Sequence, residues 1–218
     1  MPEWHPEHAT FTPFDVFAFV IEHPDGVIIV DTGVGMGNPN IDALYNHTTV
    51  DLIDELHRLH IDERDVQLII NSHLHFDHCG QNDAFDAPIC AQQSEVEAAA
   101  APLYTIAEWA TISHDRSRLA NGDTNIASGV DLFHTPGHTP GHQAVVIREQ
   151  SRKLDGGDTV VIAAQCIFTS SEWADGVSDN NLHAPEWRAA AIDSVQRLKA
   201  LRPSAVYLSH DAPLHLST

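Results

Sequence analysis

Residues 71–80 read NSHLHFDHCG, and they place four potential metal ligands within six positions: His73, His75, Asp77 and His78. In an extended chain the side chains of His73 and His75 point to the same side, because alternate residues share a face. Neutral imidazole and carboxylate groups are the ordinary ligands of zinc and similar divalent ions. Four such groups at this spacing indicate a metal site rather than an ordinary polar loop.

Two further segments could complete such a site. The segment HTPGHTPGHQ (134–143) carries three histidines between prolines and glycines that favour turns: His134, His138 and His142. His210 occurs near the end of the chain in LSHD, beside Asp211. A lone histidine is more often an ordinary polar residue than a ligand. His210 nevertheless follows a predicted strand, as the two clusters do, so loops at one sheet edge would bring all of them together.

The elements that would position these residues alternate between strands and helices. Residues 14–33 predict two strands around a turn at Pro24-Asp25-Gly26. Further strands are expected in the segments 66–73, 87–92, 130–135, 142–149, 159–164 and 205–211, the last of them closing the chain. Helices are expected at 50–61, from Ser94 as N-cap with Glu97 three residues later, and at 185–201 with Pro185 at its start. With no linker visible, we expect one domain over residues 1–218, an α/β layered fold.

The composition restricts the partners and the compartment. The chain has 31 Asp and Glu residues against 11 Lys and Arg, a formal net charge of −20, which repels nucleic acid and anionic membranes. We therefore expect a small-molecule substrate. Neither a secretory signal nor a membrane-spanning run is visible, and three scattered cysteines (Cys79, Cys90 and Cys166) favour a reducing cytoplasm. The sequence leaves the oligomeric state open.

Together, the HxHxDH motif at 73–78, TPGHTPGH and the terminal SHD resemble the metallo-β-lactamase superfamily over nearly the whole chain, most closely its acyl-homoserine lactonase branch. The resemblance implies a four-layer αββα sandwich with a two-metal site at the sheet edges. It assigns His73, His75 and His138 to metal 1, and Asp77, His78 and His210 to metal 2. It also places two residues behind the ligands, where they would pack or form hydrogen bonds: Asp31, orienting a ligand histidine, and His142.

The same resemblance implies the chemistry. Two divalent ions, zinc by the family's pattern, would lower the pKa of a bound water and so make hydroxide available as the nucleophile. One ion would polarise the carbonyl of a lactone or ester and the other would accept the leaving alkoxide, with Asp77 placed to manage a proton. No serine or cysteine nucleophile is then needed.

Gln165 departs from the family's pattern, which expects a bridging aspartate after the strand that follows TPGHTPGH. That strand here ends in Gln165 and Cys166. Asp158, in GGDT, superficially fits, but it lies before the strand and so roughly 23 Å away, at the opposite sheet edge. We therefore assign Gln165 to the bridging position. Its neutral amide predicts weaker binding of the second metal. Cys166 could instead supply a thiolate, or be a small buried residue.

Phe168 is a second departure, because the lactonases place there a tyrosine whose hydroxyl contacts the substrate carbonyl. Three hypotheses therefore remain open: a lactone or ester hydrolase, a hydrolase of another small substrate, and a member that binds metal or ligand without turnover. The pocket lining is expected in the segments 4–15, 100–120 and 168–184, whose residues carry no readable substrate code.

Overall fold

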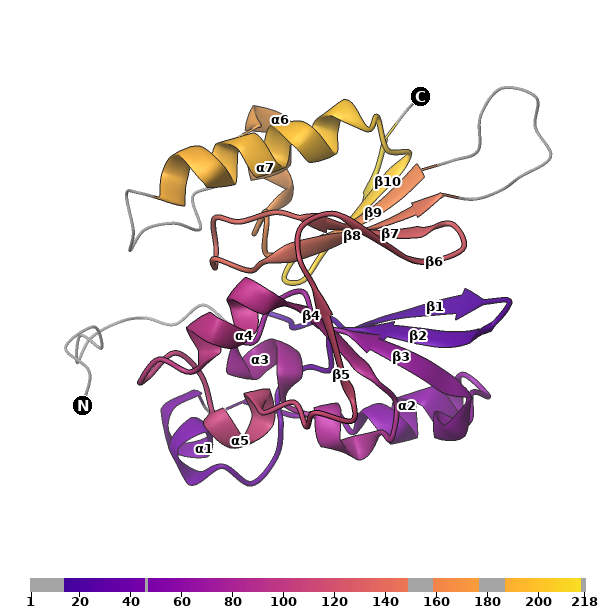
Figure 1. Cartoon of the computed structure of the whole chain (residues 1–218), viewed down its shortest axis with the longest axis vertical. Coiled ribbons are helices and arrows are strands. Elements are labelled where there is room, and N and C mark those ends of the chain that lie inside the picture. The colour runs from indigo at the N-terminus through magenta and orange to yellow at the C-terminus, as the bar shows by residue number, and fades with distance from the viewer. Residues whose placement is uncertain (1–13, 46, 149–158, 177–186, 217–218) are drawn as a thin grey trace.

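The computed structural model describes residues 14–45, 47–148, 159–176 and 187–216, which form two halves (Figure 1). The first half contains β1 (Phe19–His23), β2 (Gly26–Val30), α1 (Pro39–Tyr45), α2 (Leu52–Arg58), β3 (Val66–Ile70), α3 (Phe76–Cys79), β4 (Ile89–Gln92), α4 (Gln93–Ala99), α5 (Ala107–Ala110) and β5 (Ser117–Ala120). The second half contains β6 (Thr124–Ala127), β7 (Val130–His134), β8 (Gln143–Arg148), β9 (Thr159–Ala164), α6 (Ser170–Asp175), α7 (Arg188–Ala200), β10 (Ala205–Leu208) and β11 (Leu214–His215).

Each half is built on one mixed sheet. The first sheet has the order β1-β2-β3-β4-β5, in which β1 and β2 are antiparallel and the other neighbours are parallel. The second has the order β11-β10-β9-β8-β7-β6, in which only β9 and β10 are parallel. Helices α6 and α7 cover the outer side of the second sheet, and α1, α2 and α5 lie on the side of the first half that faces away from the second (Figure 1). The expected αββα sandwich is confirmed.

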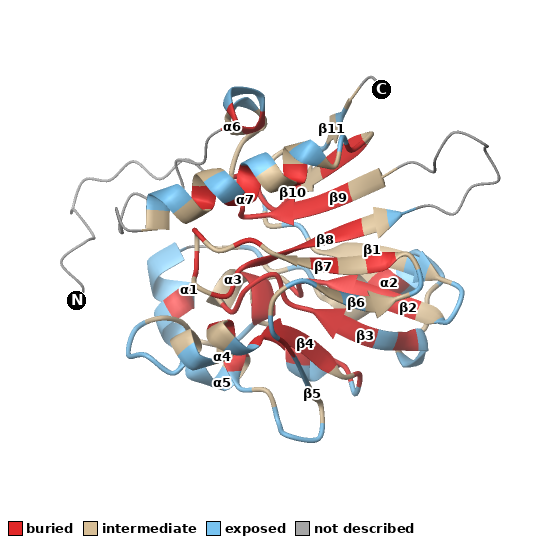
Figure 2. Cartoon of the chain, turned by 45° about the horizontal axis from the view of Figure 1, so that its top comes forward, coloured by how far each residue is buried: buried red, intermediate tan, exposed pale blue. Residues whose placement is uncertain are grey.

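The alternation of apolar side chains along each strand explains the four layers. In β2, Ile28 and Val30 belong to a buried cluster between the two sheets, whereas Val27 and Ile29 pack with Leu56 of α2. Strands β8 and β9 alternate in the same way between the opposite sheet and α7. Because both faces of both sheets are covered, inner strands such as β2, β4 and β10 are almost continuously buried, whereas β1, β5 and β6 are more exposed (Figure 2).

Helix α7 covers the second sheet through one face. Its buried residues recur at helical spacing: Ala191, Ser194, Val195 and Leu198. Val195 and Leu198 pack against Val161 of β9 and Val206 of β10. The helix therefore holds β9 and β10 side by side, and these are the strands that lead to Gln165 and His210.

Most of the predicted elements are confirmed, with two corrections. Helix α4 begins at Gln93 and its N-cap, Gln92, makes no side-chain cap bond, so the prediction of Ser94 as N-cap was wrong. Ser94 lies inside the helix and its hydroxyl donates to the carbonyl of Pro140. The strand at 205–211 is not the last, because β11 pairs antiparallel with β10. Pro185 and the segment 149–158, which contains Asp158, lie outside the described residues.

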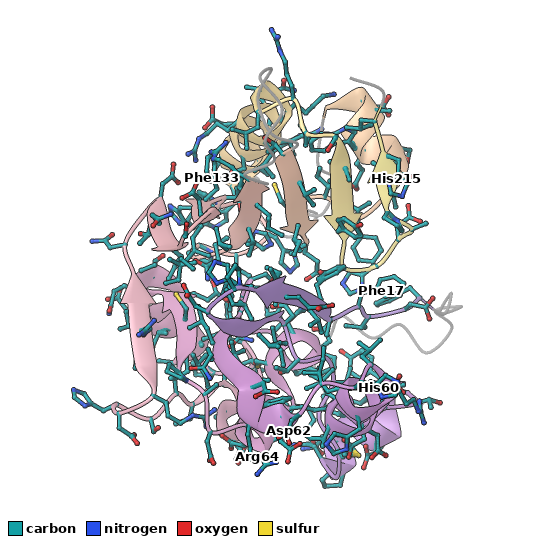
Figure 3. All side chains as sticks on the ribbon, turned by 90° about the vertical axis from the view of Figure 1, so that its right-hand side faces the viewer. Phe17, His60, Asp62, Arg64, Phe133 and His215 are labelled. Atoms are coloured by element: carbon teal, nitrogen blue, oxygen red, sulfur yellow. The ribbon has the colours of Figure 1, made fainter. Side chains whose placement is uncertain are left out.

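The two halves are joined at one edge of the sandwich. The N–H of Gln143 at the start of β8 donates to the carbonyl of Ser72 (2.8 Å), and its side-chain amide donates to the carbonyl of Asn71 (2.8 Å). Phe17 also lies where the halves meet (Figure 3), and its N–H donates to the carbonyl of Ser209 (2.9 Å). None of the helices in the described ranges has the length and apolar character required to cross a bilayer.

Candidate metal centre

Three histidines, called here the first triad, meet at this edge: His73, His75 and His138. One ligand nitrogen of each lies within 4.8 Å of the others. Nδ1 of His75 is 3.1 Å from Nε2 of His138, although the two residues are 63 positions apart in the chain. The His73 ring meets the other two edge to face, with centroids 4.7 Å away in each case. Three imidazole nitrogens thus converge on one point.

A second triad lies beside the first: Asp77, His78 and His210. Oδ2 of Asp77 is 3.3 Å from Nε2 of His78 and 3.9 Å from Nε2 of His210. The rings of His73 and His78 lie 4.2 Å apart between centroids, so the triads are neighbours. The structure therefore brings together all six side chains to which the resemblance assigned metal binding.

Local backbone conformation produces this convergence. His75 is the N-cap of α3 and has an extended backbone (φ −67, ψ 153). The chain up to it keeps His73 and His75 on one side, and the helical turn that follows carries Asp77 and His78 back toward them. His138 precedes β8 and His210 follows β10, so both come from loops of the second half.

Polar contacts at the ring nitrogens that face away from the centre orient the imidazoles of His73 and His210. Nδ1 of His73 lies 3.0 Å from the hydroxyl of Ser72, and Nδ1 of His210 donates to the carbonyl of Asp15 (2.9 Å). In His73, His78 and His210 the opposite nitrogen, Nε2, is buried and makes no hydrogen bond with the described residues. A ligating histidine needs one ring nitrogen held and the other bare, so these residues fit a metal ion.

Asp31 connects the loop after β2 to the centre. Its carboxylate accepts hydrogen bonds from the N–H and the hydroxyl of Ser72, both at 2.7 Å, and lies 2.9 Å from Nδ1 of His78. Asp31 is fully buried and has a left-handed backbone (φ 59). The residue that the sequence placed behind a ligand histidine therefore contacts His78.

His142 lies behind the first triad and outside both groups. Its Nδ1 is 2.8 Å from the hydroxyl of Thr135, and its ring centroid is 5.5 Å from that of His73. His134 lies elsewhere, with Nε2 at 3.0 Å from the carbonyl of Pro140. Of the three histidines in this segment, only His138 belongs to a triad.

Burial and the neighbouring carboxylates set different protonation states for the histidines of the centre. Burial lowers the pKa of His73 and of His138 well below the ordinary value, and lowers the pKa of His210 to about 4. For His78, burial is outweighed by the carboxylates of Asp77 and Asp31, which raise its pKa to about 10. Despite burial, His78 lowers the pKa of Asp77. The first triad is therefore a set of neutral imidazoles, which is the form that ligates metals.

The two residues after β9 are buried at the same edge. Ala164, the last residue of β9, has a left-handed backbone (φ 49) and pairs with Leu208, two positions before His210. Gln165 follows and is 7% exposed. Cys166 packs into the core beneath α7, and burial raises the pKa of its thiol to about 12, so it stays protonated. Asp158 lies outside the described residues, and its neighbour Thr159 is at the opposite end of β9.

Two aromatic rings cover His210. The ring of Phe168 stacks on it at 4.7 Å between centroids, and Phe14 meets it edge to face at 4.8 Å. Phe14 is 56% exposed, so this pair forms an apolar surface beside the second triad. Phe168 was predicted near the centre, and Phe14 lies within the segment 4–15 that was expected to line the pocket.

A model of the metallo-beta-lactamase superfamily matches residues 11–210. The chain belongs to this superfamily. An N-acyl homoserine lactonase from a Bacillus species is 30% identical over 94% of this chain and 86% of its own. The N-acyl homoserine lactonase AiiA of Bacillus thuringiensis subsp. kurstaki is 32% identical over 90% of this chain and 81% of its own.

A solved structure leads to the same superfamily. It is an N-acyl homoserine lactone hydrolase with its product, N-hexanoyl-L-homoserine, bound at the catalytic metal centre. Its TM-score is 0.74 at 31% identity, covering 93% of this chain and 85% of that one. The predictions of a metallo-β-lactamase fold and of a lactonase-like, metal-dependent hydrolase are confirmed. A superfamily member that binds metal without turnover is not favoured by these relatives.

One part of the centre was not predicted. Glu95 of α4 is fully buried and contacts both loops of the first triad, and Tyr104 packs its ring on His75 at 4.9 Å. In the sequence Glu95 lies near the start of a helix, where acidic residues are common on solvent-exposed surfaces. Nothing in that pattern distinguished it from its neighbour Glu97, which is exposed.

Proposed function

We propose that this protein hydrolyses N-acyl homoserine lactones or closely related lactones, using two zinc ions. His73, His75 and His138 would hold one ion, and Asp77, His78 and His210 the other. The observation that carries the proposal is the pair of adjacent triads, in each of which one ligand atom per residue lies within 4.8 Å of the other two. Nε2 of His73, His78 and His210 is buried and makes no hydrogen bond with the described residues. The lactonases among the relatives support the substrate class, since they cover most of this chain.

When bound, the ions would act as Lewis acids that polarise the lactone carbonyl and make hydroxide available near neutral pH. Residues of the chain would transfer the proton, orient a ligand and exclude water. Asp77 is a carboxylate already in the metal-free protein, where despite its burial the neighbouring His78 lowers its pKa. As a carboxylate it could accept a proton from the attacking water and return it to the leaving oxygen. Asp31 fixes the ring of His78, and Phe14 and Phe168 exclude water from one side.

Gln165 modifies this proposal. A glutamine offers a single neutral oxygen where the superfamily's pattern has a bridging carboxylate. Two cations at this position would therefore repel each other more strongly, because one negative charge between them is missing. We infer that the second triad holds its ion more weakly than the first.

A second candidate is a hydrolase of another small ester or amide on the same centre. It is favoured by Phe168, which stacks on His210 and has no hydroxyl to donate to a lactone carbonyl. The two candidates share the metal chemistry and differ only in which substrate fits against the aromatic surface.

The test combines metal analysis with a substrate panel. Purified protein, chelator-treated and then reloaded with zinc, is assayed on homoserine lactones of several acyl lengths and on unrelated esters and amides. We expect ring opening of the lactones that requires zinc. We also expect that His75→Ala and His210→Ala each reduce both the metal content and the turnover. Turnover of esters alone would favour the second candidate, and a protein that takes up no transition metal would refute the metal centre itself.

A further inference from the structure

A buried carboxylate stands behind the first triad. Glu95 is fully buried, and both of its oxygens are used. Oε1 accepts hydrogen bonds from the N–H of Leu74 (2.9 Å) and the hydroxyl of Tyr104 (2.6 Å). Oε2 accepts from the hydroxyl of Thr139 (2.7 Å) and the N–H of Gly141 (3.0 Å). Four donors from three separate segments thus converge on one side chain.

Two of these donors are chain neighbours of the triad's histidines. Leu74 lies between His73 and His75, and Thr139 directly follows His138. The ring of Tyr104, held by Glu95, also packs against His75. A single carboxylate therefore links both chain segments that supply the first triad.

Gly141 allows this link to be direct. A Cβ at this position would lie 2.2 Å from the backbone nitrogen of Glu95 and 2.4 Å from its Cβ. The loop thus approaches the backbone of α4 with no side chain between them. Any larger residue would push the loop, and His138 with it, away from the helix.

The charge of Glu95 has no cationic partner among the described side chains, where every ion pair involves other residues. Burying an unpaired carboxylate is costly unless its hydrogen bonds and a nearby positive charge offset the cost. The first triad consists of three imidazoles and no carboxylate, unlike the second, which includes Asp77.

We propose that Glu95 is the positioning residue of the first triad: it sets the separation of His75 and His138 and supplies the negative charge that their ion lacks among its ligands. This inference rests on the proposed function, since it requires a cation in the first triad. Glu95 would act through the histidines and would not touch the substrate.

The test is a Co²⁺ titration of metal-free protein in a His210→Ala background, where only the first triad is complete. Glu95→Gln keeps the size of the side chain but presents an NH₂ group to two of its four donors. We expect the Co²⁺ dissociation constant to rise about 10-fold or more, with shifted visible absorption bands, because outer partners of metal ligands typically contribute this much. The matched control is Glu97→Gln, an exposed residue of the same helix, which should change neither.

Thermal unfolding of the metal-free proteins separates positioning from simple structural support. A Glu95→Gln protein that folds and binds Co²⁺ with the parent's affinity and spectrum overturns the inference, even if its melting temperature falls. If Glu95→Gln does not fold, Tyr104→Phe carries the test: it removes one hydrogen bond, and an unchanged Co²⁺ spectrum and affinity would overturn the inference. Failure of the parent itself to bind Co²⁺ would instead refute the proposed function, a result distinguishable because it appears before any change at Glu95.

Discussion

Oδ2 of Asp31 and Nδ1 of His78 lie 2.9 Å apart, and neither side chain is exposed to solvent. The carboxylate fixes which ring nitrogen of His78 faces the centre, and with a metal ion in the second triad it would strengthen that nitrogen as a ligand. Asp31 thereby acts on the second triad from a loop that contributes no ligand.

Replacing Asp31 by asparagine should weaken this arrangement without unfolding the loop, because asparagine also tolerates the left-handed backbone at this position (φ 59). We expect zinc affinity or turnover to fall about 10- to 100-fold. Zinc content after dialysis and kcat measure the effect. Asp25→Asn is the control, since that carboxylate is 85% exposed, and equal losses in the two variants would contradict the role of Asp31.

Restoring a carboxylate with Gln165→Asp should raise metal occupancy toward two ions per chain. The reason is a charged oxygen about 2 Å from each cation in place of a neutral amide. Lactone turnover should rise with occupancy, as measured by elemental analysis and kcat. Gln93→Asp, at the exposed start of α4, adds the same charge elsewhere and should change neither. If instead Asp158→Ala strips metal while Gln165→Asp has no effect, Asp158 is the bridging residue.

Phe168→Tyr should increase lactone turnover several-fold, since one hydrogen bond to the carbonyl contributes about 0.5–1.5 kcal/mol. The stacking on His210 should survive, because the two rings have the same shape. Comparison of kcat/KM with that of Phe17→Tyr, an aromatic residue at the junction of the halves, checks the specificity of the effect. A decrease on lactones together with a gain on esters would favour the second candidate function.

The metal-free protein should lose stability as the pH falls below about 6.5, the ordinary pKa of histidine. Burial lowers the pKa of His142 to about 3 and of His210 to about 4, so the unfolded chain takes up protons that the native protein does not. His78, with its pKa raised to about 10, acts oppositely: its contribution is complete below about 6.5 and is lost toward pH 10. Because burial lowers the pKa of five histidines, their effect dominates in the acidic range; they are His73, His75, His138, His142 and His210.

Denaturant midpoints of metal-free protein at pH 7 and pH 5 measure this dependence. His210→Asn removes one of the lowered groups and should reduce the difference between the two midpoints. An equal or larger difference in that variant would show that His210 is not held neutral by the fold.

The segments that supply the ligands could be predicted because their signals are local, whereas the division of the ligands into two triads came from the resemblance to the superfamily. The spacing of His73, His75 and Asp77 is meaningful wherever a strand passes into a loop, and strand ends predicted that His138 and His210 would share one edge. Glu95 could not be predicted in this way. Its role depends on the loop around Gly141 reaching the backbone of α4, a contact between segments 46 positions apart.

The two corrected elements have similar causes. Ser94 and Glu97 match a capping pattern, but β4 passes directly into α4, so the helix starts before the residue that would cap it. Strand β11 consists of Leu214 and His215 alone, too short to show any alternation, and it exists because β10 offers a free edge. The start of α4 and the formation of β11 were therefore determined by contacts that are made only in the folded chain.

The triads draw on both halves, and this has a consequence for the time at which the protein can take up metal. During synthesis the chain emerges from its N-terminus, so His73, His75, Asp77 and His78 appear together, while each triad still lacks its third member. The first triad is completed only when His138 has emerged, 63 positions after His75, and the second is completed only when His210, which follows β10, has emerged. Neither triad can therefore offer all three of its ligands before part of the second half has been made, and a prematurely terminated chain that lacks β10 and its loop cannot complete the second triad.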